Sequence, residues 1–117
     1  MNLGYNTNGF AHHRLEDAIA ILSELGYTSV AITLDHHALN PFDNDLPRQI
    51  SRVRNQLDRY RMRCVIETGA RFLLDPRRKH QPTLLSVDAD ERQRRLDFLR
   101  RSVEIAHELD ADAVSFW

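Results

Sequence analysis

Hydrophobic residues along the chain follow two spacings, one typical of β-strands and one typical of α-helices. Four short apolar runs predict strands near residues 3–6, 29–35, 63–68 and 112–117. Between these runs, hydrophobic residues recur every three or four positions, which predicts three amphipathic helices. Strands that alternate with helices are typical of βαβ units, so the pattern predicts an α/β fold with a parallel sheet.

Each predicted helix has one apolar stripe and a recognisable start or end. The stripes consist of Leu15, Ala18, Ile19 and Leu22, then Leu46, Ile50, Val53, Leu57 and Tyr60, and finally Leu96, Leu99, Val103 and Ala106. Gly26 is expected to end the first helix, and Asp45 and Asp88 are expected to cap the second and third. Acidic residues are interleaved with the arginines of the third helix, so we expect these arginines to be solvated: Arg92, Arg94, Arg95, Arg100 and Arg101.

The predicted strands each have one apolar face and one smaller or more polar face, because successive side chains of a strand alternate. The apolar set, suited to a cover of helices, is Leu3, Tyr5, Val30, Ile32, Leu34, Cys64, Ile66, Val114 and Phe116. The other set is Gly4, Asn6, Ala31, Thr33, Asp35, Val65, Glu67, Ala113, Ser115 and Trp117.

The polar second face distinguishes between two α/β architectures. A doubly wound sheet of the Rossmann-like or flavodoxin-like kind needs apolar residues on both faces of its central strands. A closed barrel instead has a packed interior with polar groups at its C-terminal mouth. We therefore interpret residues 1–117 as one partial domain, the N-terminal half of a TIM (β/α)₈ barrel, with four strands and three helices.

The loops that follow the predicted strands are longer than those that precede them. Short connections are expected at 26–28, 61–62 and 110–111, whereas the segment 69–88 forms a long loop after the third strand. Long irregular loops in compact domains are usually functional. Since ligands of parallel α/β folds bind at the carboxyl ends of strands, this asymmetry predicts a binding face there.

Four residues end the polar faces of the strands: Asn6, Asp35, Glu67 and Trp117. Glu67 is the candidate catalytic carboxylate, although a loop-capping role or an ion pair with Arg71 is the alternative. Asn6 and Asp35 are candidate substrate contacts, with turn formation and loop capping as the alternatives. Trp117 is large enough to wall a substrate pocket or to fill the top of a barrel.

Two histidines, His36 and His37, directly follow the second strand. Imidazole binds Zn, Mn or Fe and carries protons, so His36 is a candidate catalytic residue and His37 a candidate substrate contact. Neighbouring residues of an extended chain point apart, so at most one of them is expected to face a site, and a role outside catalysis stays open for both. His12 and His13 are expected at the surface or as capping residues.

The loop after the third strand is rich in cations: Arg71, Arg77, Arg78 and Lys79. Guanidinium groups form bidentate bonds to phosphate and carboxylate, so these residues are candidates for binding an anionic substrate. Arg71 is the strongest candidate because it lies closest to the strand. A solvated loop or a contact between subunits is the alternative.

Composition narrows the function classes. The formal net charge of the 117 residues is −1, which does not favour a nucleic-acid or membrane partner. The single cysteine, Cys64, excludes an internal disulfide and is expected to be a small buried hydrophobic residue. No apolar run reaches the roughly 20 residues of a membrane span, and no signal peptide is recognisable, so we expect a cytoplasmic protein.

Three segments carry a resemblance to a known family: 3–7 (LGYNT), 34–37 (LDHH) and 67–72 (ETGARF). They resemble the sugar phosphate isomerase/epimerase group of the xylose-isomerase-like barrels, which also include endonuclease IV. The similarity spans essentially the whole chain, as the N-terminal half of such a barrel. It implies a divalent metal, Mn, Mg, Zn or Co, with ligands on later strands beyond residue 117, and no metal ligands in this chain.

The resemblance implies a metal-dependent isomerase or epimerase that transfers a proton next to the carbonyl of a sugar or sugar phosphate. This chain would supply substrate-pocket residues and is expected to be inactive by itself, and a homo-oligomer is compatible with it. A non-catalytic small-molecule-binding barrel is the alternative. An endonuclease IV-like enzyme is disfavoured, because Glu67-Thr68 and Phe116-Trp117 stand where that group has zinc-binding histidines.

Overall fold

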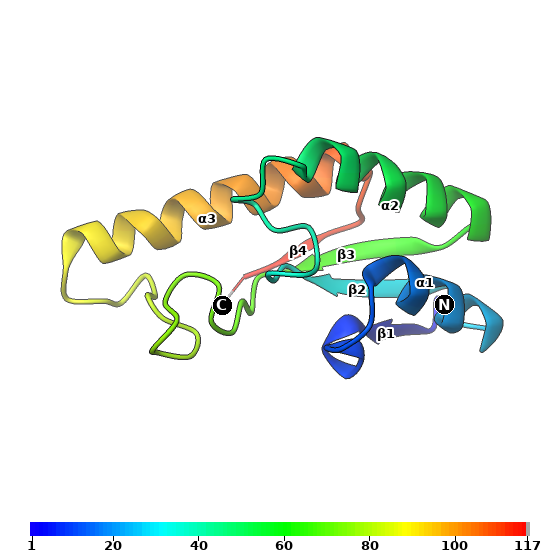
Figure 1. The fold of residues 1–117 in the computed structure, drawn as a ribbon, viewed down its shortest axis with the longest axis horizontal. Coiled ribbons are helices and arrows are strands. Elements are labelled where there is room, and N and C mark those ends of the chain that lie inside the picture. Colours follow the sequence, from blue (N-terminus) through cyan, green and yellow to red (C-terminus); the bar gives the residue numbers. More distant parts are fainter. Residues whose placement is uncertain (117) are drawn as a thin grey trace.

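The computed structural model describes residues 1–116 and has four strands in one parallel sheet of order β1-β2-β3-β4. The strands are β1 (Gly4–Asn6), β2 (Ser29–Thr33), β3 (Arg63–Glu67) and β4 (Val114–Ser115). The helices are α1 (Leu15–Glu24), α2 (Leu46–Tyr60) and α3 (Ala89–Glu108), with a 3₁₀ helix, η1 (Thr7–Phe10), after β1 (Figure 1). This is the predicted strand–helix alternation, with the arrangement of the N-terminal half of a TIM barrel.

The hydrophobic core lies between the helices and one face of the sheet. Val30, Ile32 and Leu34 from the second strand run and Cys64 and Ile66 from the third are buried there. The residues between them, such as Ala31 and Val65, remain half-buried on the other face. Helices thus cover one side of the sheet, and the face assignment made from the sequence holds for the two central strands.

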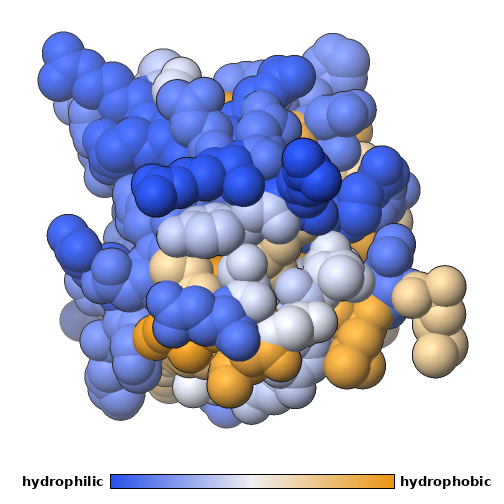
Figure 2. Space-filling model, turned by 90° about the vertical axis from the view of Figure 1, so that its right-hand side faces the viewer, coloured by the Kyte–Doolittle hydropathy of each residue, from blue (hydrophilic) through white to orange (hydrophobic). Residues whose placement is uncertain are grey.

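At the edges of the sheet this assignment is wrong. Leu3, Tyr5 and Phe116 were expected under helices, but all three are exposed. β1 and β4 have a neighbouring strand on one side only, so the layer of helices ends over them. Figure 2 looks onto the end where the strands begin; its hydrophobic colour gathers low on this face, at the height of β1, below the charged surface of α2 and α3.

Helix α3 presents a different face to the core than its apolar residues alone predicted. Leu99 and Ala106 are buried as expected, but Val103 is 46% exposed. Polar and apolar residues share the buried face: Arg95, Phe98, Leu99, Ser102, Ile105 and Ala106. Ser102 enters the core because its hydroxyl donates to the Phe98 carbonyl (2.7 Å), four residues earlier.

Arg95 is the largest departure from the sequence prediction, because it was expected on a solvated face and is only 3% exposed. Its Nη2 donates to the carbonyl of Thr68 (3.1 Å), and its guanidinium lies 5.2 Å from the ring centroid of Phe98. Burial lowers the pKa of this guanidinium. Arg95 therefore holds the segment that directly follows β3.

The predicted helix ends are confirmed at two of three positions. Asp88 caps α3, since its carboxylate accepts from the backbone N–H groups of Asp90 (2.7 Å) and Glu91 (3.1 Å). Gly26 follows α1 with a φ of 88°, a conformation that favours glycine. Asp45 stands at the start of α2 but its side chain caps no backbone group; it lies 3.6 Å from the guanidinium of Arg52 instead.

None of the helices that the structure describes is both long enough and apolar enough to cross a bilayer.

The rotated face of α3 predicts different costs for two similar truncations. Ile105→Ala removes a fully buried side chain and is expected to lower the free energy of unfolding by about 2–5 kcal/mol. Val103→Ala removes an exposed one and is expected to change it by less than about 0.5 kcal/mol. Urea denaturation of both variants measures the difference, and equal losses would contradict the observed face.

Candidate functional site

Side chains of three neighbouring strands form a row at the carboxyl end of the sheet. Thr33 is the register partner of Glu67, and Glu67 is the register partner of Ser115. Residues in register point to the same side, and this is the side away from the helices. Within residues 1–116, the half-buried Glu67 carboxylate has neither a hydrogen bond nor an ion pair. It is therefore an acceptor aimed at the interior of the mouth, flanked by two hydroxyl residues.

Asn6 forms a turn, which was the alternative to substrate binding. Its Oδ1 accepts from the backbone N–H of Asn8 (2.8 Å) at the start of η1 and from the Thr33 hydroxyl (3.2 Å). Thr7 adds a second link, because its hydroxyl accepts from the backbone N–H of Thr33 (3.0 Å). The amide oxygen of Asn6 is thus engaged in joining η1 to β2, and its role as a substrate contact stays a prediction.

Asp35 and Arg71, both predicted substrate contacts, bind each other. Oδ2 of Asp35 accepts from Nε (3.2 Å) and Nη2 (3.0 Å) of Arg71, while its Oδ1 accepts from the backbone N–H of His36 (2.8 Å). The pair joins the loop after β3 to the end of β2. Arg71 is therefore held at the mouth by a carboxylate from another loop, and the expected alternative, a pair with Glu67, is not formed.

A small pocket of about 40 Å³ opens beside this ion pair. Its lining includes Thr33, Asp35, His37 and Arg71. That volume holds about one water molecule, so the pocket is one corner of a site and not a whole substrate pocket.

Of the two histidines after β2, His37 lines the small pocket and His36 does not. Both line a second cleft farther out, between α1 and α2. The separation agrees with the expectation that at most one faces the mouth, and it favours His37 over His36. The catalytic role of His36 stays a prediction, with its side chain in the outer cleft.

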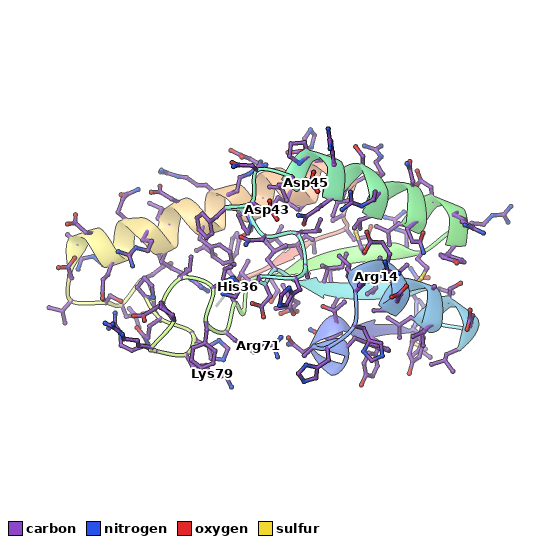
Figure 3. All side chains as sticks on the ribbon, in the orientation of Figure 1. Arg14, His36, Asp43, Asp45, Arg71 and Lys79 are labelled. Atoms are coloured by element: carbon purple, nitrogen blue, oxygen red, sulfur yellow. The ribbon has the colours of Figure 1, made fainter. Side chains whose placement is uncertain are left out.

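The three later cations of the basic loop have different surroundings. Arg78 binds Asp75 (Nε–Oδ2, 2.7 Å) and also Glu91 at the start of α3. Hydrogen bonds lower the pKa of the Asp75 carboxyl. The largest effect comes from the backbone N–H of Arg77 and the next from the Arg78 side chain. Arg78 thus fastens the loop to α3. The side chains of Arg77 and Lys79 are exposed and form no ion pair with another residue of the 1–116 segment. Figure 3 shows Arg71 and Lys79 on this loop.

The loop is also anchored in the core, since Leu73 and Leu74 belong to the buried cluster. Its backbone closes on itself where the N–H of His80 donates to the carbonyl of Arg71 (2.6 Å). These contacts hold Arg71 in place at the end of the sheet. Trp117, the remaining predicted substrate contact, lies outside the described residues.

Sequence reasoning missed Arg95 and the hydroxyl neighbours of Glu67. Arg95 lies three positions before Phe98 and four before Leu99, so helical spacing indicated that all three share one face. The charge of Arg95 led to the opposite prediction, a solvated side chain. Thr33 and Ser115 were correctly put on the inner face, yet only the register brings them beside Glu67. Cys64 is buried as predicted, and burial raises its pKa to about 11, which makes it a poor nucleophile.

A sequence model of one family, described as xylose isomerase-like TIM barrel, matches residues 19–117. The chain belongs to this family. The match covers most of the chain and agrees with the parallel sheet, its helix cover on one face and its polar mouth. No curated protein matches the chain.

No three His, Cys, Asp or Glu side chains of residues 1–116 converge in a way that could hold a metal ion. The described side chains therefore do not fit a resident metal by themselves.

The Asp35–Arg71 ion pair predicts energetic coupling in this xylose isomerase-like barrel. Both side chains are partly shielded from water, with exposed fractions of 20% and 33%, so the pair is expected to stabilise the fold by about 1 kcal/mol. A double-mutant cycle with Asp35→Ala and Arg71→Ala, read by urea denaturation, measures this coupling. Strictly additive losses would mean that the pair contributes no stability.

Proposed function

We propose that this chain supplies the substrate pocket of a sugar or sugar phosphate isomerase or epimerase that works by proton transfer next to a carbonyl. The observation that carries the proposal is the Glu67 carboxylate, which lies on the inner face of a xylose isomerase-like barrel with no partner among residues 1–116. Active sites of TIM barrels lie at this end of the strands.

In the proposed reaction Glu67 acts as the base. Its carboxylate takes the proton from the carbon next to the carbonyl, and the electron pair of that C–H bond moves into the enolate. In an isomerisation Glu67 returns the proton to the neighbouring carbon, while the proton of that substrate hydroxyl passes to the former carbonyl oxygen. An epimerisation needs a second acid on the opposite face, which gives its proton to the same carbon while Glu67 keeps the one it took. Thr33 and Ser115 flank Glu67 in register. The Thr33 hydroxyl is buried and already donates to Asn6, so Ser115 is the one suited to a hydrogen bond with a sugar hydroxyl.

Arg71 is the proposed contact for the anionic end of the substrate, with Arg77 and Lys79 as further cations of the same loop. Asp35 occupies one edge of the Arg71 guanidinium, through Nε and Nη2, and the remaining N–H groups stay available to a phosphate. Asn6 and His37 are proposed to contact the sugar. Arg78 is a weaker candidate, because it is already bound to two carboxylates.

A divalent metal with ligands after residue 117 is part of the same proposal and rests on the family resemblance alone. The second candidate function is a non-catalytic sugar-binding barrel. The Asp35–Arg71 pair is the observation that favours it, because a carboxylate bound to the proposed anion contact is also typical of a purely structural pair.

Removal of the proposed base tests the enzyme against the binding protein. In the whole protein, Glu67→Gln is expected to lower kcat by about 100-fold or more, because the amide cannot take a proton, while the unfolding transition stays unchanged. The matched control is Glu24→Gln, at the exposed end of α1, where turnover should not change. Full turnover in Glu67→Gln would remove this carboxylate from the reaction.

The anion contact is tested by comparing a phosphorylated with an unphosphorylated sugar. Arg71→Ala is expected to lower kcat/KM for the phosphorylated sugar by about 10- to 150-fold, the value of one charge-assisted hydrogen bond, and to leave the unphosphorylated sugar nearly unaffected. Arg54→Ala, in an exposed residue that binds the Glu108 carbonyl, is the control. Equal losses for both sugars would mean that Arg71 only holds the loop.

A further inference from the structure

Arg95 is a buried cation to which the proposed reaction assigns no role. It lies near the start of α3, a helix that runs past the carboxyl ends of the strands (Figure 1), and only 3% of it is exposed. Its guanidinium lies 5.2 Å from the ring centroid of Phe98, a contact that favours one orientation of the planar group. Burying a charged side chain costs free energy, and an apolar side chain of similar size in its place is often equally stable or more so. Packing alone therefore does not account for an arginine at this position.

The atom that Arg95 binds is the carbonyl oxygen of Thr68, the residue directly after Glu67. Nη2 of Arg95 donates to this oxygen at 3.1 Å, and the backbone N–H of Ala70 donates to it at 2.8 Å. Thr68 is fully buried and is itself a donor, because its N–H (3.2 Å) and its hydroxyl (2.6 Å) both reach the carbonyl of Ser115. Arg95 is thus the first member of a hydrogen-bonded chain that runs from α3 through the end of β3 to the end of β4.

This chain of hydrogen bonds fixes the backbone around Glu67. The carbonyl of Glu67 accepts from the N–H of Leu34 (3.2 Å) on the other neighbouring strand run. The peptide groups on both sides of Thr68 are therefore held, the first by the neighbouring strands and the second by Arg95. Because the carboxylate of Glu67 has no hydrogen-bond partner within residues 1–116, the direction of this side chain depends on the backbone that carries it.

The sheet has little other support at this point. The strand β4 (Val114–Ser115) has two residues, which is short for a strand. Gly69 directly follows Thr68, and a glycine leaves the backbone torsions freer than other residues do. Thr68 therefore stands where regular strand pairing ends, and the bond from Arg95 holds the chain there.

We propose that Arg95 is a positioning residue for the inner face: by holding the Thr68 carbonyl, it keeps the Glu67 carboxylate in place at the reacting carbon. The inference rests on the proposed function, since it names the residue that orients the base of that reaction. Arg95 is not a catalytic residue, because it lies on the buried face of α3 and does not line the small pocket at the mouth. A lysine would replace it only in part, since an ammonium is a point donor on a flexible stem and the guanidinium is a rigid plane.

Kinetic constants separate a positioning role from a purely structural one. In the whole protein, Arg95→Met is expected to lower kcat for a pentose phosphate by about 10- to 100-fold and to change KM by less than about 3-fold, because a displaced base slows proton transfer but not binding. Arg94→Met, in the exposed neighbour on the same helix, is the control and should keep full turnover. An unchanged kcat in folded Arg95→Met would overturn the proposal.

The conservative variant Arg95→Lys is expected to restore part of the turnover lost in Arg95→Met. If Arg95→Met does not fold, the lysine variant decides instead, with a kcat expected to be at least about 3-fold lower than that of the unmodified protein at unchanged KM. Full turnover in Arg95→Lys would then contradict the proposal.

A double variant tests whether Arg95 acts through Glu67. Added to Glu67→Gln, the change Arg95→Met is expected to cost no further turnover, since the carboxylate that it positions is already gone. Losses that multiply would mean that Arg95 supports turnover by another route, and this outcome overturns the proposal. Full turnover in Glu67→Gln alone would instead overturn the proposed function, so the two failures are distinguishable.

Amide hydrogen exchange checks the structural step without a substrate. In Arg95→Met the amides of Thr68 and Ala70 are expected to exchange at least about 10-fold faster, because the carbonyl at the centre of the chain has lost a donor. The amide of Leu109, which donates to the Ile105 carbonyl at the other end of α3, should be unchanged. Equal acceleration at all three amides would mean that Arg95 stabilises the whole fold, which contradicts a local positioning role.

Discussion

The structure depends on one constraint, the burial of a single face of the parallel sheet. Val30, Ile32, Cys64 and Ile66 point into a core made by the three helices, and none of them is more than 3% exposed. Because strand side chains alternate, this burial forces Thr33 and Glu67 onto the other face. The carboxylate at the centre of the proposed function therefore owes its direction to hydrophobic residues one position away.

A second layer of contacts connects the strand ends to one another. Asn6 and Thr7 accept hydrogen bonds from Thr33 and so join η1 to β2. Asp35 binds Arg71, and Arg95 donates to the carbonyl of Thr68. Each contact joins residues 26 or more positions apart in the chain. Most polar side chains at the mouth thus form hydrogen bonds that hold its loops and strand ends together. Glu67 differs from them because its carboxylate has no partner within residues 1–116.

The charged groups on the loops also divide into two kinds. Arg78 and Arg52 are bound to carboxylates and fasten segments together, so their charges are neutralised locally. The histidines that line the cleft between α1 and α2 have no such carboxylate partners in the part of the chain that the structure describes. The inner mouth and the cleft between α1 and α2 consequently differ in chemistry: the mouth presents a carboxylate, and the cleft presents imidazoles.

Hydrophobic spacing by itself determined the order of strands and helices, the buried face of β2 and β3, and the inward direction of Glu67, because these features depend on residues close together in the sequence. It was wrong for Val103 on α3 and for Tyr5 on the edge strand, whereas Arg95 was put on the solvated face because of its charge. Helical spacing does not fix the rotation of a helix about its axis to within one residue, so it cannot say which neighbouring residue faces the core. On an edge strand, the helices do not extend far enough to bury the apolar face. Only the tertiary structure decided that Asp35 pairs with Arg71, that His36 and His12 line one cleft, and that Thr33 and Ser115 flank Glu67. Such pairings depend on strand register and loop paths between distant segments, which no local pattern of residues encodes.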